Sequence, residues 1–246
     1  MNAVRRFDFL IVKNCAREGG GLLEVLLEKE GLSFTSIDLD AGDAFPDANT
    51  YHGLIVMGGP DSANDDTPKM KQEIEVIRDH VRSGKPYFGV CLGLQTLVKA
   101  LGGSVVRNPV KEIGFHDPSG EQFAVDLTAL GVKDPLLKGL PSSFPVFQLH
   151  GETVVPAKGM ATLGTGEYCV EQIIRAAPLA YGVQFHIELT EQMFEEWIKE
   201  DSELRTMHKE QLRKEFQDSR AIFEEHLTIM FGNFLSLARS STAVSA

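Results

Sequence analysis

Cys91 is the residue with the strongest potential for covalent chemistry, because it stands in the run Gly89-Val90-Cys91-Leu92-Gly93. A predicted strand precedes it and an amphipathic helix follows, which is the pattern of a nucleophile elbow with cysteine as nucleophile. The flanking glycines suit a sharp strand-to-helix turn in which side chains would clash. The start of the helix offers free N–H groups and partial positive charge, which favour a thiolate. The alternative is a buried structural cysteine, which is our prediction for Cys15 and Cys169.

His186 is the first candidate for the general base that such a thiol needs. It stands at the end of a predicted buried strand, two residues before Glu188, and alternate residues of a strand share a face. The carboxylate can then hold one imidazole tautomer, as the aspartate of a serine triad does. A structural polar pair would explain this short motif as well, so its weight comes from the cysteine elbow. His150, followed by Gly151, is the second candidate, with a plain loop histidine as the alternative.

Acyl transfer from a thiol also needs an oxyanion hole, for which two backbone segments are candidates. The N–H of Leu92 directly follows the nucleophile, and Gly59 belongs to a glycine-rich strand end, Met57-Gly58-Gly59-Pro60. A simple tight turn is the alternative for that segment. The sequence contains no GxxxxGK[ST], GxGxxG, HExxH or CxxC motif, so we expect neither a nucleotide cofactor nor a bound metal.

The elements that would position these residues alternate along the first part of the chain. Strands are predicted at 7–14, 33–40, 51–59 and 85–90, and helices at 21–31, 68–84 and 92–103. Such alternation predicts a parallel sheet with helices on both faces. Sites in these sheets form at the carboxyl ends of the strands, where the candidate residues lie.

The remainder of the chain predicts a β-rich excursion over 111–166, two further buried strands, and helices from 190 onward. We expect one domain over 1–190, a helical extension of the same domain over 191–238, and a disordered tail over 239–246. An apolar stripe runs from Leu204 to Phe234 at near-helical spacing. We favour packing of this stripe on the protein's own sheet over docking of a second subunit or a partner.

Composition narrows the class of protein. The chain has 246 residues, 43% of them hydrophobic and 24% charged, and a formal net charge of -11. This is the balance of a soluble globular protein, and an acidic surface argues against nucleic acid and against a polybasic membrane anchor. No apolar run reaches the roughly 18–20 residues that span a bilayer. Three widely spaced cysteines do not suggest a disulfide framework, so we expect a cytoplasmic protein.

Taken together, these motifs resemble the class I, or triad, glutamine amidotransferases, and most of all the glutaminase domain of GMP synthase and its free-standing relatives. The similarity covers most of 51–188. The family's G-x-C-x-G-x-Q motif falls on 89–95, and its F-H-P-E motif falls on 185–188. Two positions depart from the pattern: Ile187 replaces the usual proline, and Phe115 stands where relatives often carry tryptophan.

The resemblance implies a flavodoxin-like three-layer α/β sandwich with a mainly parallel central sheet. It also implies an enzyme that cleaves the side-chain amide of glutamine through a γ-glutamyl thioester on Cys91, without a cofactor. The roles that it assigns fall on the catalytic residues Cys91, His186 and Glu188, the oxyanion donors Gly59 and Leu92, and the substrate-binding residues Gln95, His150 and Gly151.

The acceptor of the ammonia does not follow from these motifs. The segment after Glu188 shows only a helical pattern, so the resemblance implies an acceptor on a synthetase partner. A γ-glutamyl hydrolase that acts alone is the alternative within the same chemistry. A cysteine peptidase, a deglycase or an inactive regulatory module fits the motifs less well, and a homo-oligomer is compatible with all of these functions.

Overall fold

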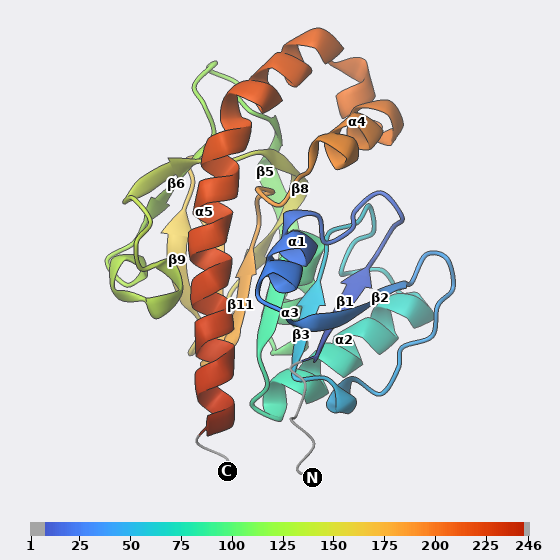
Figure 1. Cartoon of the computed structure of the whole chain (residues 1–246). Helices are drawn as coiled ribbons and strands as arrows, with labels where there is room; N and C mark the ends of the chain where they lie inside the picture. Colours follow the sequence, from blue (N-terminus) through green and yellow to red (C-terminus); the bar gives the residue numbers. More distant parts are fainter. Residues whose placement is uncertain (1–7, 244–246) are drawn as a thin grey trace.

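The computed structural model describes residues 8–243, and its centre is a nine-stranded sheet (Figure 1). The strand order is β2-β1-β3-β4-β11-β10-β9-β6-β7. The first five strands run parallel to their neighbours: β2 (Ser33–Asp38), β1 (Asp8–Lys13), β3 (Gly53–Val56), β4 (Tyr87–Val90) and β11 (Ala180–Val183). The predicted start of the first strand at residue 7 lies outside the described residues.

The other four strands turn the sheet antiparallel, and three of them come from the predicted β-rich excursion. They are β10 (Ile173–Ala177), β9 (Ala161–Thr165), β6 (Ala124–Leu127) and β7 (Ser143–Pro145). Two further strands, β5 (Ser104–Gly114) and β8 (Gln148–Val155), form a separate antiparallel pair. The predicted α/β fold is confirmed, and the excursion extends the main sheet as well as adding this small one.

Helices cover both faces of the sheet, which makes three layers. The side chains of β1 show why, since Phe9 and Ile11 belong to one apolar cluster while Leu10 and Val12 belong to another. The first cluster includes residues of α1 (Leu22–Lys29) and α5 (Lys209–Ala243), and the second includes residues of α2 (Pro68–Arg82) and α3 (Leu92–Ala100). A strand that is apolar on both faces therefore finds a helical layer on each side.

Local signals set the helix boundaries as expected. Thr67 accepts a hydrogen bond from the N–H of Met70 at 3.2 Å and Pro68 opens α2, while Gly84 takes a φ of 77° after its end. The short α4 (Glu191–Glu200) begins in the same way, with Thr190 as its cap. Four 3-10 turns complete the described elements: Ala48–Thr50, Gly131–Lys133, Pro135–Leu137 and Leu204–Thr206.

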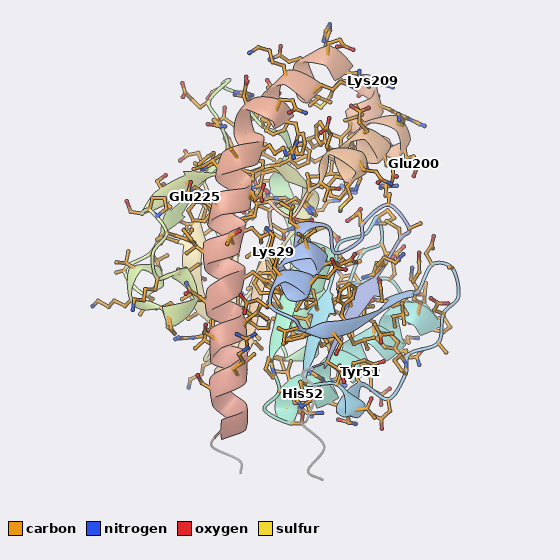
Figure 2. The ribbon with its side chains drawn as sticks, viewed as in Figure 1. Lys29, Tyr51, His52, Glu200, Lys209 and Glu225 are labelled. Atoms are coloured by element: carbon orange, nitrogen blue, oxygen red, sulfur yellow. The ribbon has the colours of Figure 1, made fainter. Side chains whose placement is uncertain are left out.

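The C-terminal helix α5 packs its apolar stripe on the protein's own sheet. The rings of Phe231 and Phe234 lie 5.7 and 5.3 Å from that of Phe88 on β4, and Phe223 stacks on Phe115 at 6.3 Å. Charged residues such as Glu225 lie on the outer side of the helix (Figure 2). The intramolecular interpretation of the stripe therefore agrees with the structure.

The end of α5 differs from the expectation of a disordered tail over 239–246. The helix continues to Ala243, and residues 244–246 lie outside the described part of the chain. Ala238 is buried against the core, and Ser240 Oγ donates to the carbonyl of Ser236 at 2.9 Å, so the last turns have both packing and hydrogen bonds. Over residues 8–243, no helix is long and apolar enough to cross a membrane.

Candidate active site

Cys91 occupies a sharp turn between β4 and α3. Among the described residues it is the only non-glycine residue with a positive φ, at 52°. The flanking glycines follow from contacts of the turn, because a Cβ at Gly89 would lie 2.4 Å from the carbonyl oxygen of Gly93. A Cβ at Gly93 would lie 2.1 Å from the carbonyl oxygen of Val56 on the neighbouring strand. The backbone therefore has the strained geometry of a nucleophile elbow.

The thiol of Cys91 is held among polar groups at the start of α3. It is 6% exposed, and Gln184 Nε2 lies 3.5 Å from Sγ as a donor. Gln95 of α3 donates to the oxygen of the same amide, since its Nε2 is 3.2 Å from Gln184 Oε1. Leu92 is the first residue of the helix, where backbone N–H groups have no intrahelical acceptor.

His186 and Glu188 lie just beyond β11, which ends at Val183, rather than at the end of the strand as predicted. The N–H of His186 donates to the carbonyl of Phe147 at 2.8 Å and keeps the chain extended. His186 Nδ1 lies 2.7 Å from Glu188 Oε1, and both side chains are buried. Ile187, the departure from the family motif, does not open this pair.

The charge state of His186 follows from its neighbours. Burial alone lowers the pKa of the imidazole, but the Glu188 carboxylate and a hydrogen bond with Cys91 outweigh it and hold the pKa well above the usual value. Since Nδ1 bonds Glu188, Nε2 is the nitrogen left for the sulfur. The geometry therefore suits proton exchange between Cys91 and His186.

Gly59 follows β3 at the same edge of the sheet. A Cβ on Gly59 would lie 2.6 Å from Asn14 Cβ and 3.3 Å from Leu92 Cδ2, so the bare backbone packs against both residues. Gly59 and Cys91 line one cavity of about 310 Å³. The structure thus brings together the two predicted oxyanion segments beside the thiol.

Five of the eight predicted site residues line this cavity: Gly59, Cys91, Gln95, His150 and Gly151. The sequence analysis gave no role to other lining residues, Lys111 on β5 and residues 201–203, which follow Glu200 at the end of α4 (Figure 2). These residues reach the site only through the packing of distant segments.

Glu152 on β8 is a further cavity residue that the sequence analysis did not assign. Its Oε2 accepts a hydrogen bond from the Ser62 hydroxyl at 2.8 Å. The other lining carboxylates have cationic partners: Asp201 lies 3.1 Å from Arg17, Asp61 lies 2.5 Å from Lys69, and Glu203 pairs with Lys111. Glu152 is therefore the lining carboxylate best suited to a ligand ammonium group.

Both ring nitrogens of His150 belong to a buried hydrogen-bond network. Its Nε2 lies 2.7 Å from Glu112 Oε2 and its Nδ1 lies 2.9 Å from the carbonyl of Glu152. Gln172 Nε2 donates to the same Glu112 oxygen at 2.9 Å. With both ring nitrogens engaged, His150 is placed to support the cavity wall and not to act as the base.

Cys169 completes this network and raises the question of a metal. The ligand atoms of Glu112, His150 and Cys169 lie within 4.8 Å of one another. Burial raises the pKa of the Cys169 thiol to about 12, and Thr153 Oγ1 lies 3.2 Å from its sulfur. Carboxylate, imidazole and thiolate groups are common metal ligands. Here the thiol is protonated and His150 is hydrogen-bonded to Glu112, so the three residues form a packed polar network.

Comparison with known proteins defines the class. Residues 22–202 match the family described as glutamine amidotransferase class-I, and the chain belongs to this family. A glutamine amidotransferase-like protein of Salmonella typhimurium, YfeJ, is 29% identical over 188 residues, covering 74% of this chain and 76% of that protein.

Two curated relatives with named reactions match a smaller part of their own length. A gamma-glutamyl-L-1-hydroxyisopropylamide hydrolase of a Pseudomonas species is 29% identical, covering 57% of this chain and 48% of the relative. The GMP synthase of Thermosipho africanus is 32% identical, covering 60% of this chain but 26% of the relative. The chain thus spans about half of the first and a quarter of the second.

Solved structures share the fold over nearly the whole chain. A glutamine amidotransferase from Methylobacillus flagellatus is 26% identical with a TM-score of 0.83, covering 94% of this chain and 95% of that one. One from Thermotoga maritima has the same TM-score at 24% identity, covering 93% and 98%. The matched part covers so much of this chain that it includes most of α5.

Proposed function

We propose that this protein is a cysteine hydrolase of the glutamine amidotransferase type, which releases ammonia from the side-chain amide of glutamine for transfer to an acceptor on a partner. The observation that carries the proposal is the buried His186–Glu188 pair beside Cys91 at the wall of a cavity. The acceptor itself is not identified by the chain.

Acylation begins when His186 takes the proton of the Cys91 thiol. The thiolate attacks the side-chain carbonyl carbon of glutamine, and the carbonyl oxygen becomes an oxyanion held by the N–H groups of Leu92 and Gly59. The C–N bond then breaks as His186 returns the proton to the leaving ammonia. Glu188 keeps the imidazole in the tautomer that these transfers need.

Deacylation uses the same groups in reverse roles. His186 removes a proton from water, and the resulting hydroxide attacks the γ-glutamyl thioester. The C–S bond breaks, the thiolate of Cys91 recovers its proton from His186, and glutamate leaves. The cycle needs no redox partner, since every step is a proton transfer or an acyl transfer.

The amino-acid end of the substrate would bind across the cavity from the thiol. Glu152 can accept a hydrogen bond from the α-ammonium group, because the Ser62 hydroxyl that donates to Glu152 is neutral. Gln95 and the His150-Gly151 segment support it, since Gln95 Nε2 and His150 Nδ1 both contact the backbone carbonyl of Glu152, at 3.3 and 2.9 Å.

A second candidate is a γ-glutamyl hydrolase that acts alone on substituted amides. The similarity to the Pseudomonas hydrolase favours it, because that protein's name specifies a γ-glutamyl amide with a substituted nitrogen. The thioester chemistry is identical, and only the leaving amine differs.

One assay tests both candidates. The purified protein is incubated separately with L-glutamine and with γ-glutamyl isopropylamide, and glutamate release is measured, with Cys91→Ala as the control. We expect glutamate from L-glutamine in the wild type and none in the control. Faster release from the substituted amide would instead favour the stand-alone hydrolase. Equal release by the wild type and Cys91→Ala would refute the thiol mechanism.

A further inference from the structure

Glu18 is a buried carboxylate close to the proposed active site that the triad does not use. It lies in the loop between β1 and α1 and is 5% exposed. Glutamate is rarely buried to this extent without a partner. Its ion pair with Arg17 is long, at 3.8 Å, and the same guanidinium lies 3.1 Å from Asp201. Another group must therefore provide most of the positive charge that stabilises the Glu18 carboxylate.

The contacts of the glycine at position 58 place His186 beside this carboxylate. The point where a Cβ of Gly58 would lie is 2.1 Å from Glu18 Oε2 and 3.2 Å from His186 Cε1. The carboxylate and the edge of the imidazole thus share the space that a side chain at 58 would fill. This explains why a residue without a side chain stands there.

The charges around Glu18 support the same pairing. Burial raises the pKa of Glu18 and the nearby Glu188 carboxylate adds to this effect, whereas the charge of His186, followed by that of Arg17, lowers the pKa. Cys15 forms a side-chain hydrogen bond with Glu18, and burial raises the pKa of that thiol to about 12. Cys15 therefore remains a thiol and donates its S–H to the carboxylate, which orients Glu18.

We propose that Glu18 is a positioning residue, whose carboxylate stabilises the imidazolium form of His186 together with Glu188. The positive charge of an imidazolium is shared by the C–H group between its two nitrogens, which is the edge that Glu18 faces. A carboxylate at this edge favours the charged ring and leaves Nε2 free for the sulfur and the substrate. The inference rests on the proposed thiol chemistry of Cys91.

The groups that act on His186 come from four segments. Glu188 bonds Nδ1, Cys91 faces the ring from the start of α3, and Glu18 faces it from the loop after β1. Trp197 of α4 packs on the ring with its centroid 4.8 Å away and carries no charge. The Arg17–Asp201 pair lies behind Glu18. Removing the charge of Glu18 must therefore make the imidazolium lose its proton at lower pH.

The test follows alkylation of Cys91 by iodoacetamide against pH in the full-length protein, located by peptide mass spectrometry. For a thiolate–imidazolium pair, the alkylation rate rises in two steps as the pH increases. The lower step marks formation of the pair, and the upper step marks loss of the imidazolium proton. We expect Glu18→Gln to move the upper step down by about one pH unit, the low end for a nearby opposite charge. Glu18→Asp, which keeps the charge at a longer distance, should move it less.

A matched control removes a buried carboxylate elsewhere. Asp134 is 3% exposed and pairs with Arg175 on β10 at 2.6 Å, so Asp134→Asn should leave both steps in place. An upper step that is unchanged in Glu18→Gln overturns the inference. If circular dichroism shows that Glu18→Gln is unfolded, the profile of Glu18→Asp decides. An upper step at lower pH supports the inference, and an upper step at the wild-type pH overturns it. Wild-type labelling on another cysteine would overturn the proposed function as well.

Discussion

At the scale of single residues, the site depends on backbone contacts as much as on reactive groups. The positive φ of Cys91 turns the chain so that its thiol reaches the edge of the sheet and α3 begins beneath it. Gly89 and Gly93 permit this turn because a Cβ at either would meet backbone atoms. The same turn places the N–H of Leu92 beside the sulfur, so one local conformation serves the proposed nucleophile and the proposed oxyanion hole.

The proposed roles of His186 and Glu188 predict different costs of substitution. His186→Ala removes the base, whereas Glu188→Gln keeps the imidazole in place and removes only its orienting charge. In a comparable triad, loss of the base costs roughly 10⁶-fold in kcat and loss of the carboxylate roughly 10⁴-fold. We expect the same order in steady-state glutaminase rates. Wild-type rates in His186→Ala together with an inactive His150→Ala would show that the base is His150.

The sequence predicts those site residues that belong to short motifs. The elbow around Cys91 and the pair of His186 and Glu188 are local patterns, and the structure brings them together. Glu18 and Glu152 gave no such signal, because each reaches the cavity or the base through contacts between distant segments. Their placement depends on tertiary packing, which a single sequence does not display.

At the scale of elements, the alternating pattern of strands and helices predicts the parallel half of the sheet well. Strands apolar on both faces, such as β1, leave no other arrangement. The order of the antiparallel strands could not be predicted in the same way. The strands β10, β9, β6 and β7 come from short, interrupted apolar runs, which do not indicate which strand pairs with which. The separate β5–β8 pair, which carries Glu112 opposite His150, was likewise not predictable.

Helix α5 provides the clearest test at this scale. Phe223 is 2% exposed and stacks on Phe115, so Phe223→Asp buries an unpaired charge and removes a ring from the core. We expect a loss of stability of at least about 4 kcal/mol, since truncating a core phenylalanine alone costs about 3–5 kcal/mol.

Denaturant unfolding followed by circular dichroism measures this change. Ala221→Asp is the matched control, because it places the same new side chain on an exposed position of the same helix. Its midpoint should stay near that of the wild type. If Phe223→Asp keeps the wild-type midpoint but changes the mass found by light scattering, the stripe would be a docking surface instead.

At the scale of the whole molecule, buried titratable groups couple the stability of the fold to pH. Glu73 of α2 is fully buried, and its Oε1 lies 3.4 Å from Asn14 Nδ2. Burial raises the pKa of this carboxyl to about 7. The unfolded chain loses the proton near pH 4.5, whereas the folded protein keeps it until about pH 7, so stability declines as the pH rises through this window.

Glu73→Gln should remove this decline, because an amide stays neutral at every pH. Relative to the wild type, the variant should gain on the order of 2–3 kcal/mol of unfolding free energy between pH 5 and pH 8. Urea titrations at the two pH values give the difference, with Glu75→Gln, an exposed position of the same helix, as the control. A constant difference between Glu73→Gln and the wild type would contradict an ionisation of Glu73 in this range.

The central claim is that Cys91 forms a covalent bond with the side-chain carbon of a glutamine-like substrate. The most direct measurement is labelling with a glutamine analogue that carries a diazoketone in place of the amide, followed by peptide mass spectrometry. We predict one adduct per chain on Cys91, protection by L-glutamine, and no adduct in Cys91→Ala. An adduct mainly on Cys15 or Cys169 would contradict the account.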